Sequence, residues 1–430
     1  MSVKEKYEKY VITKFVSRIE PVEVEEAEGS IVKDKSGKEY LDCFSGISVT
    51  NAGHRHPEVI EAAKEQMDKY VHVCTYVYYV EPVADLAEKL AEVTPGRLKK
   101  SFFGNSGAEA NEGAMRIAKK YTKKNEFIAL RASFHGRTIG TLSITGNYAR
   151  KRGGGPFLSG IAFAPTPYCY RCPFGKTYPN CNLECAKAVE DVFRFDTSDN
   201  VAAFIAEPVM GEGGIIPPPK EYFKEVKSIL EKHGSLFIAD EVQSGFGRTG
   251  KLFAIEHYDV EPDIMTMAKG IADGFPISAF ITRDEIADAF EVGDHLSTFG
   301  GNPVSAKAAL ANLDVMLRDK LPERAEEIGR YLMDKLNALK EKYPLIGDVR
   351  GKGLMVGIEL VLDKEKTPAD VVAGKLRHRA LEEGLLIGKG GIYGNVIRFQ
   401  PPLVITKSQI DDAVGILDKV LEEFKGEYKG

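Results

Sequence analysis

The chain has 430 residues, of which 43% are hydrophobic and 28% are charged, and its net charge is -5. This composition is typical of an ordinary globular protein, and the length predicts two domains with separate hydrophobic cores. A weakly acidic chain lacks the basic surface that nucleic acid or an anionic membrane attracts, so these partners are excluded and small-molecule partners are expected.

The N-terminal segment 1–26 carries many charges and no apolar stretch of the kind found in a secretory leader. No run of about 18 apolar residues follows anywhere in the chain, which favours a cytoplasmic protein without a membrane partner. Lys and Glu are abundant, Trp is absent, and Gln occurs only at positions 66, 243, 400 and 409. This bias is typical of proteins from thermophiles.

Between residues 100 and 282, short apolar runs alternate with amphipathic helical segments. The helical pattern after Pro219, for example, repeats apolar residues on one face and ends before Gly234. Nearly continuous apolar strands that alternate with helices are typical of a buried, mainly parallel sheet, so an α/β fold is predicted. We expect this large domain to span residues 61–309.

A candidate phosphate site lies where a strand ending at Gly104 is followed by a turn of small residues and a helix beginning near Ala108. The free backbone amides of Gly107 and Ala108, with the Ser106 hydroxyl, can hold a phosphate at the positive end of this helix. A plain strand-to-helix turn is the alternative. The two interpretations differ in whether the other parts of a phosphate cofactor site exist.

Four of the six cysteines lie in one short segment with the pattern C-x2-C-x8-C-x3-C. A structural zinc site, two disulfides and buried free thiols are all compatible with this spacing. Any zinc ion here would be structural, because four thiolates leave no position open for a substrate. The residues are Cys169, Cys172, Cys181 and Cys185.

Two adjacent acids, Asp240 and Glu241, follow the apolar strand 236–239. Because side chains alternate along a strand, only one of them can point into a given crevice at the carboxyl end of the sheet. The next residues, GFGRTG, satisfy the pattern G-x-G-x-x-G, and an NAD-binding oxidoreductase is therefore an alternative. Against it, no suitable crossover helix follows the glycines, and the two carboxylates would repel a pyrophosphate.

Lys269 ends the apolar segment DIMTMAK, where loss of hydration would lower its pKa and free an amine that can form a Schiff base. Asp240 can pair with a ring nitrogen and keep it protonated, which makes the ring an electron sink. Phe134 offers an aromatic face on which such a ring can stack. Together with the phosphate cradle, these parts predict pyridoxal phosphate as the cofactor, with Lys269 and Asp240 as catalytic residues.

From about residue 310 the pattern changes to helices with short strands between them. Thr406 and Gln409 are spaced as a capping box, which predicts that the last helix begins there. We expect a smaller α+β domain at 310–430, joined by an N-terminal segment at 1–60.

An ordered series of motifs resembles a known family. It runs from LDCFSGISVTNAGHRHPEV through NSGAEANE, FHGRT, EPVMGEGG, DEVQSGFGRTG, MAKG and TFGGNP to GDVRGKGLM and VIRFQPPL. On these motifs the chain resembles the class III, or omega-amino acid, aminotransferases of pyridoxal phosphate fold type I. These are the 4-aminobutyrate, ornithine and acetylornithine group, which also includes amino-acid racemases. The resemblance implies a large domain with a mainly parallel seven-stranded sheet and a smaller α+β domain.

The resemblance implies further contacts with the cofactor. Val242 would pack on the ring face opposite Phe134, Gln243 would reach the ring hydroxyl, and His135 would also contact the cofactor. Thr298 resembles the threonine that a neighbouring subunit adds to the phosphate cradle. The resemblance thus implies a homodimer with composite active sites. Whether dimers pair further into tetramers stays open.

Three charged residues resemble the substrate contacts of the family. Arg398 matches the arginine that holds an α-carboxylate by a bidentate pair. Glu212 matches the glutamate that masks this arginine when the substrate presents an omega-amine. Arg137 matches an arginine that some members use for a second carboxylate. A structural ion pair is the alternative role for each residue.

The implied activity is ping-pong transfer of an amino group from an amino acid, such as 4-aminobutyrate or ornithine, to 2-oxoglutarate or pyruvate. Lys269 would take the Cα proton and return it to the cofactor. A racemase of the same family is the alternative, because return of the proton to the opposite face of Cα would invert the amino acid. Arg137 favours transfer, since a second carboxylate clamp suits dicarboxylic or omega-amino substrates.

Overall fold

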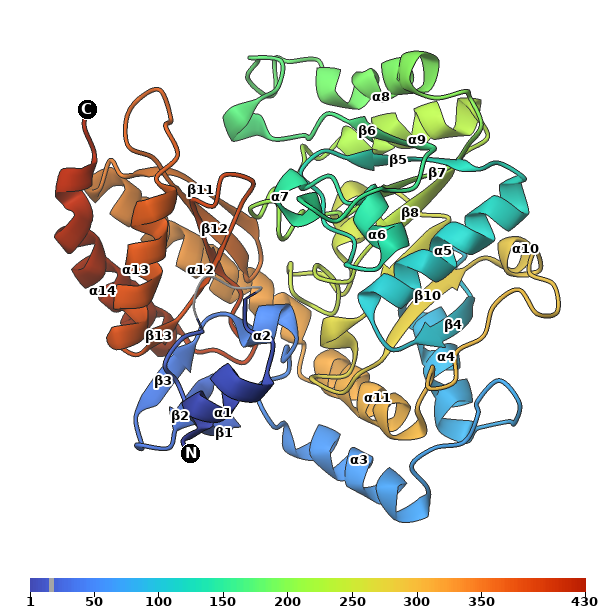
Figure 1. The fold of residues 1–430 in the computed structure, drawn as a ribbon, viewed down its shortest axis with the longest axis horizontal. Coiled ribbons are helices and arrows are strands. Elements are labelled where there is room, and N and C mark those ends of the chain that lie inside the picture. The colour runs from blue at the N-terminus through green and yellow to red at the C-terminus, as the bar shows by residue number, and fades with distance from the viewer. Residues whose placement is uncertain (15–18) are drawn as a thin grey trace.

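The computed structural model describes residues 1–14 and 19–430 (Figure 1). Its largest sheet has seven strands in the order β4-β10-β9-β8-β7-β5-β6. Strand β10 runs antiparallel to its neighbours β4 and β9, and the other pairs are parallel. The predicted α/β class with a mainly parallel seven-stranded sheet is therefore confirmed. The strands are β4 (Lys100–Gly104), β5 (Glu126–Leu130), β6 (Ile161–Ala164), β7 (Val201–Ala206), β8 (Leu236–Asp240), β9 (Ile264–Met267) and β10 (Ser278–Thr282).

The large sheet is buried on both faces, as its nearly continuous apolar strands predicted. In β5, Phe127 and Ala129 belong to one buried cluster, whereas Ile128 and Leu130 belong to another. Helix α5 (Gly107–Thr122) covers one face, while α8 (Glu184–Asp196) and α9 (Tyr222–Lys232) pack on β6 and β8 from the other (Figure 1). Shorter or peripheral helices are α4 (Glu81–Val93), α6 (Ile139–Ile144), α7 (Tyr148–Lys151) and α10 (Asp284–Ala287).

The helix predicted after Pro219 is α9, which begins at Tyr222 and ends at Lys232. Its apolar face buries five side chains, including Phe223. Gly234 follows the helix with a φ of +57°, a left-handed conformation that glycine adopts without a steric penalty. The apolar spacing and the terminating glycine therefore predicted both the face and the end of this helix.

Two four-stranded sheets have the orders β1-β2-β3-β13 and β11-β12-β15-β14. Their strands are β1 (Val24–Glu28), β2 (Ile31–Asp34), β3 (Glu39–Asp42), β11 (Ile346–Lys352), β12 (Met355–Leu360), β13 (Leu385–Leu386), β14 (Gly388–Gly390) and β15 (Val396–Phe399). Three long helices accompany them, α12 (Leu321–Lys342), α13 (Asp370–Glu382) and α14 (Lys407–Phe424). Helix α14 begins at the predicted capping box, because the side chains of Thr406 and Gln409 each accept from the other's backbone amide.

The N-terminal strands pair with the C-terminal part of the chain, since Leu41 of β3 lies opposite Leu385 of the parallel strand β13 (Figure 1). This pairing supports the proposal that residues 1–60 join a smaller domain at 310–430. Helix α3 (Pro57–Lys69) packs against α11 (Pro303–Arg318), and α1 (Val3–Tyr10) and α2 (Ser45–Ser48) precede them. The proposed boundary after residue 309 falls within α11, and the division into three segments stays a proposal.

Membrane spans were sought among the helices of the described ranges 1–14 and 19–430. None combines the length and the apolar character that crossing a bilayer requires.

Candidate active site

The carboxyl ends of neighbouring parallel strands bring the two predicted catalytic residues together. Asp240 is the last residue of β8. Lys269 lies two residues beyond β9, at the first position of the turn η3 (Lys269–Ile271). Asp240 lies opposite Thr266 in the parallel pair of β8 and β9, and Lys269 follows Thr266 by three residues, so both residues lie at the same edge of the sheet. Ligands of open α/β sheets bind at this edge.

Asp240 is held from several directions. Its Oδ2 accepts hydrogen bonds from His135 Nδ1 at 2.7 Å and from Asn111 Nδ2 at 2.9 Å, and its Oδ1 accepts from the backbone amide of Val242 at 3.1 Å. Glu241 makes separate contacts, with Ser244 Oγ at 2.6 Å and the amide of Ile255 at 2.7 Å. The side chains of these two adjacent acids therefore contact different sets of residues, as the alternation of side chains along a strand predicts.

Lys269 is half-buried and adopts a φ of +49°, which is uncommon for a residue other than glycine. Backbone strain of this kind is typical of functional sites whose surroundings hold the residue in place. Burial lowers the pKa of the ammonium group to about 8, although the nearby carboxylates of Asp240 and Glu207 act in the opposite direction. A substantial fraction of the amine is thus neutral near physiological pH.

The predicted phosphate cradle lies at the N-terminus of α5. Ser106 is the N-cap of this 16-residue helix, and its hydroxyl accepts from the backbone amide of Glu109 at 3.3 Å. Gly107 and Ala108 are the first two helical residues, so their amides have no partner within the helix. A Cβ at Gly107 would lie only 2.7 Å from Val242 Cγ1, which explains why glycine is needed here.

Thr298 is exposed in the segment before α11. The adjacent Ser297 Oγ accepts a hydrogen bond from Asn105 Nδ2 at 3.3 Å, and Asn105 directly precedes Ser106. The segment that carries Thr298 is therefore next to the cradle of the same chain.

The aromatic residue and the predicted ring contacts lie on three different segments. Phe134 is half-buried, and its backbone amide donates to Glu207 Oε1 at 3.0 Å. The exposed guanidinium of Arg137 lies 5.4 Å from the centre of the Phe134 ring. Gln243 is buried, and its Oε1 accepts from Gln400 Nε2 at 2.8 Å. His135 is buried beside Asp240, and its Nε2 has no hydrogen-bond partner among the residues that the structure describes.

Arg398 and Glu212, the predicted substrate contacts, form an ion pair with Nη1 and Oε2 3.1 Å apart. Arg398 is a buried residue of β15, and its Nη2 donates to the carbonyl of Lys389 at 3.1 Å. Burial would raise the pKa of Glu212, but the guanidinium groups of Arg398 and Arg150 outweigh it and lower this pKa. Glu212 is therefore a carboxylate that covers the arginine.

Several residues of the site were not predicted from the sequence. Asn111 donates to Asp240, and Glu207 accepts from the amides of Phe134 and Gly211, so both hold elements of the site in place. Burial raises the pKa of Glu207 to about 7. Asn111 lies on the buried face of α5, and a polar residue at an otherwise apolar helical position is a usable sequence signal for such a role.

The GFGRTG motif does not form a dinucleotide site. Its residues lie in turns, and only the five-residue helix η2 (Ala254–Tyr258) follows. Arg248 of the motif is fully buried, and it donates to Asn51 Oδ1 at 2.7 Å and to the carbonyls of Leu354 and Pro401. The motif therefore joins distant segments of the chain, and the oxidoreductase alternative loses the structural context that it requires.

The four clustered cysteines are free thiols in the structure. Cys181 and Cys185 are buried, whereas Cys169 is exposed. Within residues 1–14 and 19–430, no three His, Cys, Asp or Glu side chains are arranged to hold a metal ion. Burial raises the pKa of the Cys185 thiol to about 12, so this thiol stays protonated at neutral pH.

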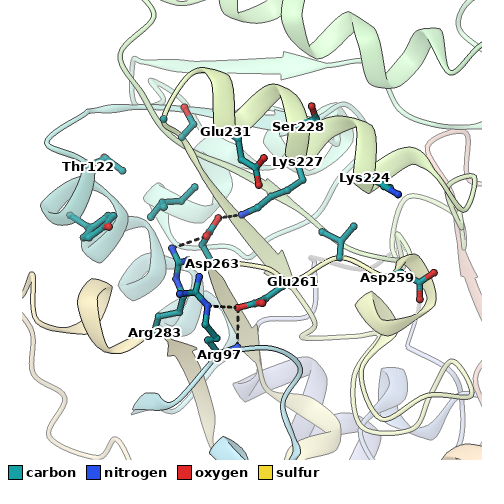
Figure 2. A pocket seen from close by; sticks show the side chains of 15 residues that line it. Arg97, Thr122, Lys224, Lys227, Ser228, Glu231, Asp259, Glu261, Asp263 and Arg283 are labelled. Atoms are coloured by element: carbon teal, nitrogen blue, oxygen red, sulfur yellow. Dashed lines mark hydrogen bonds and ion pairs between the residues drawn. The ribbon is translucent and has the colours of Figure 1, made fainter.

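A surface pocket of about 680 Å³ lies away from these residues, at the amino ends of β8 and β9 (Figure 2). Five of its charged side chains pair with one another, because Asp263 contacts both Lys227 and Arg283 and Glu261 contacts Arg97. The predicted catalytic residues lie at the opposite, carboxyl edge of the same strands. Figure 2 thus shows a set of structural ion pairs outside the candidate active site.

Comparisons with known proteins show the family to which this chain is similar. The model of the family described as aminotransferase class-III matches residues 15–421. The chain is 44% identical over 407 residues to a leucine/methionine racemase of Thermococcus litoralis, which covers 94% of this chain and 91% of that protein. It is 41% identical over 399 residues to a probable 4-aminobutyrate aminotransferase of Bacillus subtilis, with 91% of each chain covered.

A solved amine transaminase from an uncultivated Pseudomonas species, in its PLP-bound form, is 32% identical and has a TM-score of 0.90. The match covers 97% of this chain and 98% of that one. The predicted family is confirmed by a match over nearly the whole length, and the chain is an enzyme that belongs to the class III aminotransferase family.

Proposed function

We propose that this enzyme transfers an amino group from an amino acid to a 2-keto acid, with pyridoxal phosphate as cofactor, in two half-reactions that share one pocket. The proposal rests on the position of Asp240 and Lys269 at the carboxyl ends of neighbouring strands, together with the Arg398–Glu212 ion pair. Such a reaction requires an amine that is partly neutral, here Lys269, and an acid held in one orientation, here Asp240. It also requires a group that binds the substrate carboxylate, here Arg398, which Glu212 covers.

The phosphate of the cofactor fits the N-terminus of α5. The amides of Gly107 and Ala108 are free there, the Ser106 hydroxyl is exposed, and the helix dipole favours an anion. The segment that carries Thr298 borders the cradle of its own chain, and we propose that a second subunit packed against this segment brings its own Thr298 to the cradle. These groups hold the cofactor in place but do not take part in proton transfer.

The ring of the cofactor fits between Val242 and Phe134, with Asp240 facing its nitrogen. Three hydrogen bonds fix the Asp240 carboxylate, so it can hold a ring proton without turning away. His135 supports Asp240, and Gln243 is the candidate partner of the ring hydroxyl. When bound, pyridoxal phosphate supplies an electron sink for negative charge at the substrate Cα.

Lys269 would hold the cofactor covalently and, once released, move the Cα proton. Its pKa of about 8 matches a general base that works near neutral pH. The pKa shift has a structural cause, because burial disfavours the charged amine. The left-handed backbone at Lys269 fixes where the side chain begins, and thus which region of the pocket the amine reaches.

For substrates, we propose that Arg398 binds the α-carboxylate and that Glu212 masks it when an omega-amino donor occupies the pocket. 4-Aminobutyrate and ornithine are the donor types that suit such a switch, and 2-oxoglutarate or pyruvate would be the acceptor. Arg137 is exposed and has no ion-pair partner within the described part of the chain, so it is available for a second carboxylate. The relative from Bacillus subtilis supports the donor assignment.

We propose that two subunits form each active site. Large apolar side chains are exposed near Thr298, and the two segments that carry them touch, since His72 and Phe299 have ring centres 5.1 Å apart. Such a patch beside the cradle favours burial against a second copy. The exposed residues are Val71, Val77, Tyr78, Tyr79, Leu296 and Phe299.

We also propose a cytoplasmic protein from a thermophile. The free thiols of the six cysteines suit a reducing compartment. The composition is rich in Lys and Glu and poor in Gln, and a relative comes from Thermococcus litoralis. Measured melting temperature and cell fractionation would test these two assignments.

Racemisation is the second candidate function, because the relative from Thermococcus litoralis is a leucine/methionine racemase. It would use the same Lys269 and Asp240, with the proton returned to the opposite face of Cα. The Glu212–Arg398 pair favours transfer, since every amino acid that is racemised carries an α-carboxylate and never needs Arg398 to be masked.

The cofactor assignment can be tested by borohydride reduction of the purified enzyme with pyridoxal phosphate, followed by peptide mass mapping. We expect the added mass on the peptide containing Lys269 and its loss in Lys269→Ala. Lys352 is a suitable control, because burial also lowers the pKa of its amine outside the site, and Lys352→Ala should keep the label. Label on another lysine in wild type would refute the assignment.

A further inference from the structure

Glu212 contacts two arginines, and only Arg398 was predicted. Its second partner is Arg150 of the short helix α7, whose Nη2 donates to Glu212 Oε1. The side chain of Glu212 is 14% exposed, that of Arg398 is 4% exposed and that of Arg150 is 37% exposed. The carboxylate is therefore placed between a buried guanidinium and one at the surface.

The two contacts differ in kind. Arg150 makes a hydrogen bond to Glu212, whereas Arg398 Nη1 lies 3.1 Å from Oε2 without hydrogen-bond geometry. Arg398 Nε is also buried, and within residues 1–14 and 19–430 it has no hydrogen-bond partner. Nε and Nη1 of Arg398 can therefore both donate to an incoming carboxylate once Glu212 has moved away from Nη1.

The backbone around Glu212 is fixed. The amide of Gly391 donates to the Glu212 carbonyl at 3.1 Å. Arg350 donates to the carbonyls of Gly214 at 2.6 Å and Ile215 at 2.8 Å. Because these bonds hold the loop, the Glu212 carboxylate can change partners by rotation of its side chain alone.

We propose that Arg150 is a positioning residue that retains the Glu212 carboxylate when an α-carboxylate takes Arg398, and that it thereby lets one pocket accept both α-carboxylate and omega-amine substrates. The inference rests on the proposed function and adds a residue to it. Without Arg150, Glu212 has Arg398 as its one guanidinium partner. An α-carboxylate then has to displace a carboxylate that has nowhere else to pair, and buried unpaired charge is strongly disfavoured.

Lys269 is a further cation whose charge acts on Glu212. Lys269 also lowers the pKa of Glu212, but less than Arg398 and Arg150 do. Lys269 is needed for the cofactor and cannot retain Glu212 during the reaction. Arg150 is therefore the partner that stays available while the pocket is occupied.

The test uses Arg150→Gln, with Arg150→Lys as the conservative variant and Arg152→Gln as a matched control. Arg152 is exposed on the same segment and packs on Tyr148. In Arg150→Gln we expect the KM for L-glutamate and 2-oxoglutarate to rise about tenfold, with a much smaller change in the KM for 4-aminobutyrate. Arg150→Lys should recover most of the loss, and Arg152→Gln should match wild type.

Equilibrium binding of 2-oxoglutarate, measured by calorimetry, gives a readout that does not depend on turnover. When Glu212 is present, Arg150→Gln should weaken the binding of 2-oxoglutarate about tenfold. When Glu212 is replaced by Gln, the further change Arg150→Gln should leave this affinity unchanged, because Arg150 acts through Glu212. If the loss persists in the Glu212→Gln background, or if both substrate classes weaken equally, the proposal is overturned. If wild type binds as expected but transfers no amino group, the proposed function fails and the positioning role stands.

Discussion

His135 Nδ1 lies 2.7 Å from Asp240 Oδ2, and both side chains are buried at the carboxyl edge of the large sheet. With the further bonds from Asn111 and the Val242 amide, this contact holds the Asp240 carboxylate in one orientation. A carboxylate fixed in this way can keep a neighbouring ring nitrogen protonated throughout a reaction, and the carboxylate does not have to reorient. Such preorganised charges make a large contribution to electrostatic catalysis.

Asp240→Asn should lower kcat by about 10²- to 10⁴-fold, because an amide cannot keep the ring nitrogen protonated. The fold should persist, since the side chain keeps its shape. Steady-state kinetics with saturating cofactor would measure the loss. Glu241→Gln is the matched control, because Glu241 is the adjacent acid and serves Ser244 and Ile255 instead. Equal losses in the two variants would contradict the roles assigned here.

Stability should depend on pH through Glu241. Burial raises its pKa to about 7 from an ordinary value of 4.5, so folding favours the protonated form. The resulting stabilisation is fully present below pH 4.5 and is lost as the pH rises through about 7. Glu241→Gln cannot titrate, so its free energy of unfolding relative to wild type should improve by a few kcal/mol from about pH 5 to 8. Denaturant titrations would measure the free energy of unfolding of both proteins at each pH. A difference between them that does not change with pH would exclude this effect.

Gly107→Ala should weaken cofactor binding at least about tenfold, because the new Cβ would lie 2.7 Å from Val242 Cγ1 and displace a residue of the ring site. Titration of the unloaded enzyme with pyridoxal phosphate would measure the change. Gly415→Ala is the control, since Gly415 is exposed within α14 and a Cβ there meets no atom within 4 Å. This variant should bind normally and gain about 0.5–1 kcal/mol in stability.

Arg137→Gln should raise the KM for 2-oxoglutarate about tenfold more than the KM for pyruvate, because only the former has a second carboxylate. The exposed guanidinium lies over Phe134 and is free to make this contact. Arg131→Gln, at another exposed arginine of the same segment, should change neither value. A uniform rise for both keto acids would mean that Arg137 does not recognise the distal group.

Local sequence patterns predicted the parts of the site that local structure builds. Apolar periodicity predicted the strand that ends at Asp240 and the buried approach to Lys269, since a parallel strand must be apolar on both faces. Small residues before a helix predicted free amides at Gly107, because every helix N-terminus leaves its first amides unpaired. These features depend on neighbours in the chain, and a sequence records them directly.

Features that depend on tertiary contacts were not predictable in this way. Arg150 and Glu212 are 62 residues apart in the sequence. The sequence pattern around each of them gives no indication that the two side chains are in contact. Lys269 has a left-handed backbone with a φ of 49°, which the propensity of a lysine would disfavour. The spacing of the four cysteines left three interpretations open, because thiol spacing does not fix the distances between sulfur atoms.

Amino transfer between two substrates is the function proposed for this enzyme. The most direct test incubates the enzyme with pyridoxal phosphate, one L-amino acid or 4-aminobutyrate, and 2-oxoglutarate, and then measures glutamate and the enantiomers of every amino acid. We expect glutamate to form in step with loss of the donor, and no turnover when the keto acid is omitted. Catalytic formation of the D-amino acid without any keto acid, and no glutamate with it, would contradict the account and identify a racemase.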